Sequence, residues 1–220
     1  MRFKLLGAHR EFFQKNGYIE LESLLTSEDI SALSSHADQL VEKRLSDQIA
    51  YKSAEELFRV GRELWREDDL LRKKILSQPL AEIAAELFKK KKIMIGFDQL
   101  LRTGSTPGFP NMVPSSLNDI SSIFPLSGAI LIHLSGAKIP SEIIPSQPEN
   151  VVFLAPDKTI PWELFFQLPN QSYLLIAYAH PESIYVLQKK DLHTHALKKR
   201  GYGFGDRLRH ETHPIIYNAN

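Results

Sequence analysis

The chain has 220 residues, of which 43% are hydrophobic and 24% are charged, and its formal net charge is +1. These values are typical of a folded globular domain, and they exclude a disordered chain or a surface that is basic throughout. The absence of cysteine excludes disulfides, thiolate metal ligands and cysteine nucleophiles.

No stretch of the sequence has the composition of a targeting or membrane-spanning segment. His9, Arg10 and Glu11 interrupt the first apolar residues before they reach the length of a signal-peptide core. No later segment approaches 18 uncharged apolar residues. We therefore expect a cytoplasmic protein that makes no contact with a membrane.

The N-terminal region begins with a predicted short helix and a short strand. The pair Asn16-Gly17 predicts the end of the helix, because glycine tolerates the left-handed conformation that caps a helix C-terminus. Tyr18, Ile19 and Leu21 favour a short strand after this turn.

Three further helices are predicted before residue 92. Thr26 with Asp29, and Ser53 with Glu56, have the spacing of a capping box, and Pro79 suits the first turn of a helix. Apolar residues then recur at spacings of three and four. They are Ile30, Leu33, Ala37, Leu40 and Val41; then Leu57, Phe58, Leu64 and Trp65; and then Leu80, Ile83, Ala84, Leu87 and Phe88.

The pattern changes to short strands after residue 92. Residues 93–176 contain three basic and six acidic residues, whereas residues 1–75 contain 13 and 14, so the later region is the candidate for the buried sheets. Its short apolar or β-branched runs are IMIGFDQLL, LSGAILIHL, VVFLA, LFFQL, SYLLIAY, SIYVL and PIIY.

Closely spaced strands after a helical region favour an α+β fold with an antiparallel sandwich or jelly roll, and with the helices packed on its outside. We expect a single domain over residues 1–220. Residues 1–92 form its mostly helical part and residues 93–187 its jelly-roll core. Residues 188–220 form a long polar loop and a C-terminal strand.

Several segments resemble one known family. FFQKNGYIELESLLTSEDISAL, SQPLAEIAAELF with IMIGFDQLL, and VVFLAPDKTIPW with NQSYLLIAY are similar to the order of elements in phytanoyl-CoA dioxygenase-like proteins. These proteins belong to the Fe(II) and 2-oxoglutarate-dependent oxygenases. The resemblance covers most of the chain and implies a double-stranded β-helix.

The resemblance also implies a particular metal site. The family holds iron with a His-x-Asp or His-x-Glu pair and a distal histidine, and a basic residue pairs with the carboxylate of 2-oxoglutarate. Two imidazoles and one carboxylate on one side of the ion leave coordination positions open for the co-substrate and oxygen. A cationic side chain then fixes the dicarboxylate through charge-assisted hydrogen bonds.

This sequence departs from the family at each of these positions. The first pair is expected within Thr103–Ser122, where there is no histidine and Asp119 alone is a candidate carboxylate. The distal histidine is expected where Ile160 and Pro161 stand. The basic residue is expected where Gln171 and Ser172 stand. The resemblance therefore predicts the fold together with a degenerate site.

Relocated ligands are the alternative. His9 with Glu11 and His36 with Asp38 lie in predicted helices, where residues two apart point to different sides, so we discount both pairs. His180 and Glu182 follow a strand, but only 38 residues remain after them, and a structural turn at Pro181 is the favoured interpretation.

A second group of histidines lies in the late loop. In an extended segment Asp191, His193 and His195 would share one face, which makes His193 and His195 the candidate metal ligands, with help from His210 or His213. The competing interpretation is a solvated, histidine-rich surface loop. His133, inside the run AILIHL, is expected to be a hydrogen-bonded core or cavity-lining residue.

Basic residues cluster in two places. Lys89–Lys92 follow a predicted helix, whose C-terminal dipole favours cations. The late loop carries a larger group beside Tyr202 and Phe204, and it is the candidate surface for an anionic partner, including nucleic acid. This group is Lys189, Lys190, Lys198, Lys199, Arg200, Arg207 and Arg209.

Three functional hypotheses remain. The first is a diverged, non-catalytic protein with the oxygenase fold, which uses no cofactor and binds a small molecule or a protein. The second is an active Fe(II) and 2-oxoglutarate-dependent dioxygenase with ligands drawn from His133, His180, Glu182, His193 and His195. The third is a metal-responsive or nucleic-acid-associated regulator that uses the late loop.

Overall fold

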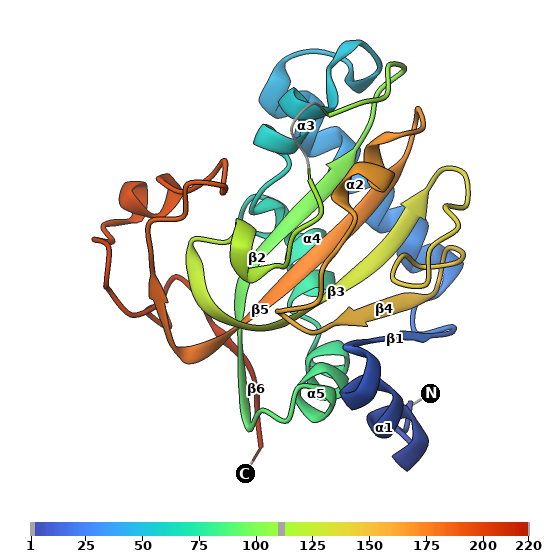
Figure 1. Ribbon diagram of the computed structural model, residues 1–220. Helices are drawn as coiled ribbons and strands as arrows, with labels where there is room; N and C mark the ends of the chain where they lie inside the picture. The colour runs from blue at the N-terminus through green and yellow to red at the C-terminus, as the bar shows by residue number, and fades with distance from the viewer. Residues whose placement is uncertain (1–2, 110–112, 220) are drawn as a thin grey trace.

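The computed structural model describes residues 3–109 and 113–219 and combines helices with one antiparallel sheet (Figure 1). Its helices are α1 (Gly7–Asn16), α2 (Ser27–Leu45), α3 (Ala54–Val60), α4 (Asp69–Ile75) and α5 (Gln78–Leu87). Its strands are β1 (Tyr18–Leu21), β2 (Lys92–Arg102), β3 (Ile123–Ser135), β4 (Val151–Leu154), β5 (Ser172–Tyr185) and β6 (Ile215–Asn218). Short 3-10 helices are η1 (Ile49–Tyr51), η2 (Leu64–Arg66), η3 (Asn118–Ile120), η4 (Trp162–Phe166) and η5 (Ala196–Arg200).

The helix boundaries follow the local signals in the sequence. Thr26 and Asp29 form a reciprocal capping box at the start of α2, and Ser53 and Glu56 form another at the start of α3. Gly17 ends α1 with a φ of 73°, a left-handed conformation that glycine adopts without a steric penalty. These predictions are confirmed.

The six strands form one sheet in the order β1-β4-β3-β5-β2-β6, and all neighbours are antiparallel. β3 lies between β4 and β5, so VVFLA and SYLLIAY are not direct neighbours. SYLLIAY and the start of SIYVL belong to the single strand β5. The pairing of β3 and β5 passes from Leu126–Ala179 to Phe124–Ile184, so residues 180–183 bulge out of the ladder.

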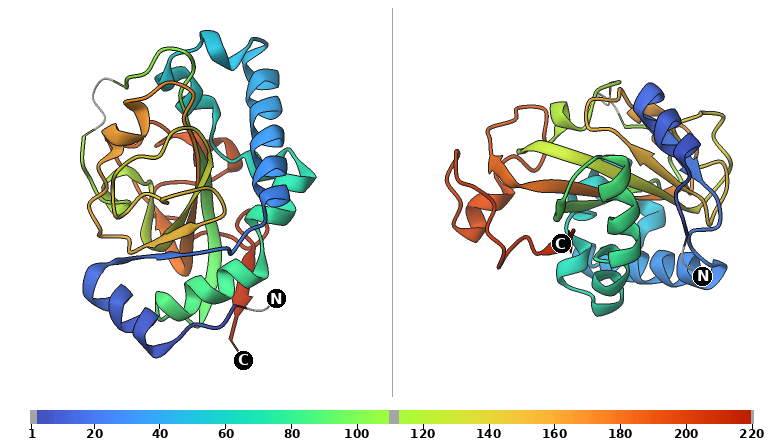
Figure 2. Two further views of the ribbon diagram at one scale, coloured as in Figure 1. Left: turned by 90° about the vertical axis from the view of Figure 1, so that its right-hand side faces the viewer. Right: turned by 90° about the horizontal axis from the view of Figure 1, so that it is seen from below.

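Side chains alternate between two buried faces of this sheet. On one side, which we call the helix face, residues such as Leu100, Ile132 and Ile176 pack with the apolar sides of the helices. On the other side, which we call the inner face, Phe97, Leu131 and Tyr173 belong to a second apolar cluster. Figure 2 shows the long helix α2 and the helix α5 on one side of the sheet and most of the loops on the other.

Loop segments, rather than a regular second sheet, cover most of the inner face. Among the described residues, an isolated bridge between Ser115 and Ile160 joins two of these segments, and η4 supplies Trp162, Phe165 and Phe166 to the buried cluster. The fold is therefore α+β and jelly-roll-like, with a curled antiparallel sheet and helices outside. Within the described ranges, no helix is long and apolar enough to cross a membrane.

Two predicted elements were wrong. The first three residues of LFFQL, 164–166, belong to the 3-10 helix η4 and not to a strand, because the chain turns at Pro161, whose carbonyl accepts from the Leu164 amide at 3.0 Å. The helix that begins after Ser53 ends at Val60, so Leu64 lies in the separate helix η2. A short apolar run alone does not distinguish a strand from a buried helical turn.

Candidate functional site

The positions where the resemblance expects a distal histidine lie in the packing of the inner face. Ile160 is fully buried, and its backbone pairs with that of Ser115. Trp162 is 1% exposed, and its indole Nε1 donates to the Ser115 carbonyl at 3.0 Å. Phe165 meets Tyr173 edge to face, with ring centroids 5.1 Å apart. Hydrocarbon and indole groups therefore occupy this part of the inner face.

The positions expected to bind a co-substrate carboxylate carry neutral side chains. The backbone amide of Gln171 donates to Thr103 Oγ1 at 2.8 Å, and the backbone amide of Thr103 donates to the backbone carbonyl of Gln171 at 3.0 Å. Ser172 is buried at the start of β5, opposite Arg102 on β2 and Ser135 on β3. Gln171 and Ser172 secure the strand end but have no cationic side chain. The neighbouring Arg102 guanidinium donates to the Gln171 carbonyl at 3.3 Å and pairs with Asp38 at 3.1 Å.

Asp119, the one candidate carboxylate in the segment 103–122, lies on the surface. It accepts hydrogen bonds from the Ser116 amide at 3.0 Å and from Ser116 Oγ at 2.8 Å, and these bonds lower the pKa of its carboxyl group. Asp119 thus closes a turn rather than facing the sheet. Residues 110–112 of this segment lie outside the described ranges, and their sequence is Pro, Asn and Met.

His133, on β3, lies on the inner face beside Tyr173. It is 1% exposed and stacks on Tyr173 with ring centroids 4.6 Å apart and an interplanar angle of 17°. Burial lowers the pKa of His133 and raises the pKa of Tyr173 to about 12. Neither ring nitrogen of His133 has a hydrogen-bond partner among the described residues. The buried position agrees with the prediction of a core or cavity-lining residue.

The other His-x-acid pairs have structural partners. His180 Nδ1 accepts from the Glu182 amide at 3.2 Å within the β5 bulge, in agreement with a structural turn. His36 Nδ1 lies 2.9 Å from the Asp68 carboxylate, while Asp38 pairs with Arg102 at 3.1 Å. In α1, His9 Nδ1 accepts from the Leu6 amide at 3.3 Å.

The late candidates His193 and His195 lie in a turn, not in an extended segment, so the geometry assumed for them was wrong. The Asp191 carboxylate is buried and accepts from the Ser122 amide and hydroxyl at 2.8 and 2.7 Å, and from the His193 amide at 2.8 Å. His193 packs beside Phe58, with ring centroids 5.8 Å apart, whereas His195 is exposed. Whether His193 and His195 bind a metal stays a prediction.

His210 and His213, the histidines that could assist the late metal ligands, lie in different environments. His213 is fully buried, and its Nδ1 lies 3.2 Å from Tyr202 Oη and 3.0 Å from Thr212 Oγ1, while His210 is exposed. Burial, with a smaller contribution from nearby Arg66, lowers the pKa of His213 to about 4. Burial followed by the charge of Arg62 lowers the pKa of His193 to about 4.

A buried charge cluster ties the late segment, which we define as residues 188–213, to the helical region. The Arg62 guanidinium lies 3.3 Å from the centroid of Phe97 and 4.0 Å from the Asp191 carboxylate. Glu63 pairs with Arg66 at 3.0 Å and with Arg200 at 2.7 Å. Sequence reasoning missed this cluster because residues 62–66 and residues 191–200 are far apart in the chain and belong to no local motif.

The histidines and carboxylates do not converge on an iron site of the family type. Within the described residues, no group of three or more His, Cys, Asp or Glu side chains is placed to hold a metal ion. The six residues outside the described ranges are Met, Arg, Pro, Asn, Met and Asn, and none of these has an imidazole or carboxylate side chain. The donor set therefore does not fit two imidazoles and one carboxylate around one ion.

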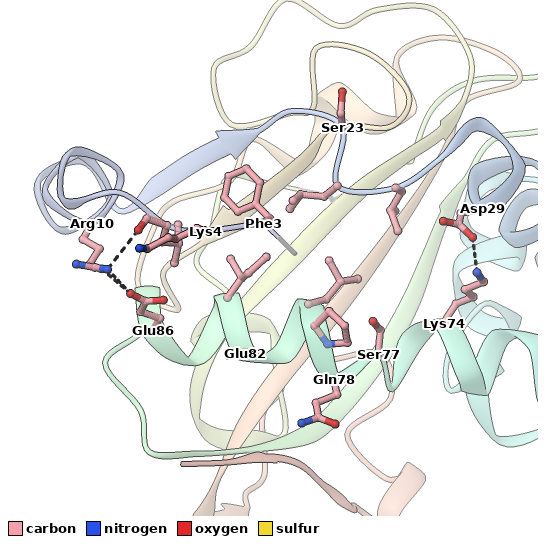
Figure 3. Close-up of a pocket in the computed structure, with 16 residues that line it drawn as sticks. Phe3, Lys4, Arg10, Ser23, Asp29, Lys74, Ser77, Gln78, Glu82 and Glu86 are labelled. Carbon is pink, nitrogen blue, oxygen red and sulfur yellow. Dashed lines mark hydrogen bonds and ion pairs between the residues drawn. The ribbon is translucent and has the colours of Figure 1, made fainter. Parts of the chain in front are cut away.

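A hollow of about 1260 Å³ lies instead outside the helix face, between α5 and two N-terminal segments (Figure 3). Its apolar lining includes Leu5, Leu80 and Ile83. Two ion pairs, Arg10 with Glu86 and Lys74 with Asp29, stand at its rim, as Figure 3 shows. None of its described lining residues is a histidine, so this hollow lacks the chemistry expected of the inner face.

Solved structures resemble this chain closely in shape and little in sequence. No protein-family model and no curated protein matches it. SnoK, a non-heme alpha-ketoglutarate-dependent carbocyclase from nogalamycin biosynthesis, is 13% identical with a TM-score of 0.70, and the match covers 96% of each chain. The epimerase SnoN, in complex with Fe3+, alpha-ketoglutarate and nogalamycin RO, is 10% identical with a TM-score of 0.69, over 95% of this chain and 97% of SnoN.

A third solved structure is also similar to this chain in architecture. EctD from S. alaskensis, with 2-oxoglutarate and 5-hydroxyectoine, is 13% identical with a TM-score of 0.62, over 86% of this chain and 80% of EctD. The narrower likeness to phytanoyl-CoA dioxygenase-like proteins stays a prediction. At these identities the agreement is one of architecture, and the chain shares the fold of these three structures.

Proposed function

We propose that this protein is a non-catalytic member of the oxygenase fold that acts by binding a small molecule or a protein. The observation that carries the proposal is the composition of the inner face. Ile160 and the aromatic residues of η4 are packed there, and Ile160, Pro161, Gln171 and Ser172 stand where the resemblance expects a metal ligand and a cation. A cytoplasmic location stays part of this proposal.

The physical reason is the cost of placing ions in such surroundings. A divalent cation and a dicarboxylate lose their hydration on binding, and only charged or strongly polar ligands replace it. The described inner face offers Gln99, His133 and hydrocarbon or aromatic groups, and the Arg62 guanidinium that lies over Phe97 is paired with the Asp191 carboxylate at 4.0 Å. Of these polar groups, Gln99 donates through Nε2 to the Phe58 carbonyl at 2.9 Å. Tight, iron-dependent binding of 2-oxoglutarate is therefore not expected.

The test is a binding and turnover measurement on the intact protein. Fe(II) is added anaerobically, 2-oxoglutarate binding is followed by calorimetry, and release of labelled carbon dioxide is followed after oxygen is admitted. We expect no saturable iron-dependent binding and no release above a protein-free control, while an active oxygenase assayed in parallel gives both. Stoichiometric co-substrate binding or turnover overturns the proposal.

The competing function is an active dioxygenase with relocated ligands. One observation favours it, since His133 has two buried ring nitrogens and His193 one that lack partners among the described residues. This function predicts stoichiometric iron after anaerobic reconstitution, and loss of that iron when His193 and His195 are both changed to alanine. Changing His9 and His36 is the matched control. Unchanged metal content in the His193 and His195 variant rejects this version of the site.

A further inference from the structure

The late segment differs from the rest of the surface in how its cations are partnered. In the helical region eight of the 16 described cations are paired with carboxylates, as in Arg59 with Glu55 and Arg72 with Asp69. Within the described residues, six exposed cations of the late segment have no carboxylate within 4.0 Å. These are Lys189, Lys190, Lys198, Lys199, Arg207 and Arg209.

The acids of the late segment do not offset this charge. The segment has seven basic and three acidic residues, which gives it a formal charge of +4 in a chain whose total is +1. Asp191 is buried against Ser122, and Asp206 accepts from the Gly203 amide at 2.7 Å. The segment therefore presents a local positive field that an anionic partner would meet first.

The backbone that carries these cations is held in place by buried side chains and backbone hydrogen bonds. Leu197, Tyr202 and Leu208 are buried in the inner-face cluster. The Tyr185 amide donates to the Asp206 carbonyl at 2.8 Å, and the Leu208 amide donates to the Ser183 carbonyl at 3.0 Å. Figures 1 and 2 show this segment standing out beside the end of β5, on the opposite side of the molecule from α1. Ordering these side chains on binding therefore costs less than ordering a free loop.

An aromatic ring lies within the cationic surface. Phe204 is 41% exposed, and its ring centroid lies 4.7 Å from Lys198 Nζ. Tyr185 supports it at 4.6 Å between centroids, and His195 lies 6.1 Å away. An exposed ring held among unpaired cations is the arrangement that accepts a nucleic-acid base while the cations contact phosphates.

We propose that the late segment is a binding surface for single-stranded nucleic acid. Phosphates contact the unpaired lysines and Arg207, and one base stacks on Phe204. A single strand is favoured over a duplex because stacking on Phe204 requires an unpaired base. The described part of the segment also contains only the five-residue helix η5, which is too short to read a major groove.

The experiment uses fluorescence anisotropy with a labelled single-stranded oligothymidylate of about 20 nucleotides at about 50 mM salt, without iron or 2-oxoglutarate. We expect saturable binding that weakens as salt rises. K198Q/K199Q/R207Q should lower the affinity at least about tenfold and make the salt dependence shallower by about 2 in the logarithmic slope. Because the assay contains no iron or co-substrate, its result is independent of the proposed lack of catalysis.

Two matched controls separate a site from general attraction. K89Q/K90Q/K91Q removes the same charge from exposed lysines outside the late segment and should change the affinity less than about twofold. F204A should weaken binding about tenfold, whereas F12A, which removes an aromatic side chain that is 44% exposed, should not. Thermal unfolding of each variant checks that the exposed substitutions leave the fold intact.

Three results overturn the proposal. The first is no binding at low salt, where attraction to phosphate is greatest. The second is an equal loss of affinity in the two triple variants, which indicates general attraction of charge. The third is equal competition by a duplex or by polyglutamate together with no effect of F204A, which indicates a surface for any polyanion.

Discussion

The two faces of the sheet are buried by different means. On the helix face, side chains of β2, β3 and β5 pack under helices whose caps can be found in the local sequence, such as Thr26 with Asp29. On the inner face, the same strands pack under loop-borne aromatics, including Trp162 and Phe165. Both faces are closed, but only the first is closed by regular secondary structure.

Under the proposed function, this difference gives the inner face a structural role in place of a ligand-filled one. A site that holds a metal and a co-substrate needs polar groups and space on one face of a sheet. Here that space contains large side chains, and Trp162, Phe165 and Phe166 are each at most 1% exposed. We therefore expect the inner face to contribute to stability as a core does, and mutations test this directly.

The largest expected effect is that of W162A. Removing a fully buried indole should lower the free energy of unfolding by about 3 to 5 kcal/mol. W65A, at a residue that is 6% exposed in the helix-face core, should cost a similar amount. Urea denaturation measures both, and Y51A, at a residue that is 77% exposed, is the surface control. A cost for W162A as small as that for Y51A contradicts a packed inner face.

The second prediction is that Asp98 and the two buried histidines change the free energy of unfolding with pH in opposite directions. Burial raises the pKa of Asp98, whose carboxylate accepts from the Leu64 amide at 2.9 Å, to about 7. Folded protein then binds the extra proton between pH 3.8 and 7, so Asp98 makes stability fall as pH rises. Burial lowers the pKa values of His193 and His213 from 6.5 to about 4. Here the unfolded chain binds the extra protons, so these histidines make stability fall as pH falls through this window.

Two variants separate these responses. Between pH 4 and 6.5, D98N should make the rise of stability with pH steeper, and H213N should make it shallower. Each change in slope should approach about 1.4 kcal/mol per pH unit, the value for one proton. Urea denaturation at a series of pH values measures the slopes, with H210N at an exposed histidine as the control. Slopes that match the unmodified protein in both variants contradict the buried titrations.

The sequence predicts the helix face better than the inner face for a physical reason. Capping boxes at Thr26 and Ser53 act within four residues, so they can be read from neighbouring letters. The inner-face contacts join distant residues, as in Ser122 with Asp191, which are 69 positions apart. Arg62 over Phe97 is likewise set by tertiary packing. No local pattern reports such pairs.

The candidate positions of the site were predicted from where the sequence differs from the family's metal and co-substrate residues. Ile160, Pro161, Gln171 and Ser172 could be located because the strands around them have recognisable apolar runs. Their surroundings could not, since LFFQL fits a strand and a helical turn equally well by composition. The turn at residues 192–195 was missed in the same way, because alternation of histidines predicts a shared face only in an extended chain.

The third prediction tests a helix cap on the helix face, which can be read from the local sequence. Ser53 Oγ accepts from the Glu56 amide at 3.2 Å, and the Ser53 amide donates to the Glu56 carboxylate at 2.9 Å. S53A removes the side-chain half of this capping box and should cost about 1 kcal/mol. Urea denaturation measures the cost, and S34A within α2 is the control for a serine without a capping role. A loss above about 3 kcal/mol would mean that the cap supports more than the end of α3.

The smallest expected change, and the sharpest test of the inner face, is H133L. Leucine keeps an apolar side chain beside Tyr173 and removes two buried nitrogens that lack partners among the described residues. The free energy of unfolding should therefore change by less than about 1 kcal/mol, or rise, because no hydrogen bond is lost and a desolvation penalty disappears. L131A, two residues away on the same strand and face, should instead cost about 2 to 5 kcal/mol. A loss above about 2 kcal/mol in H133L would mean that water or a ligand binds the imidazole, and that the inner face keeps a polar site within its apolar packing.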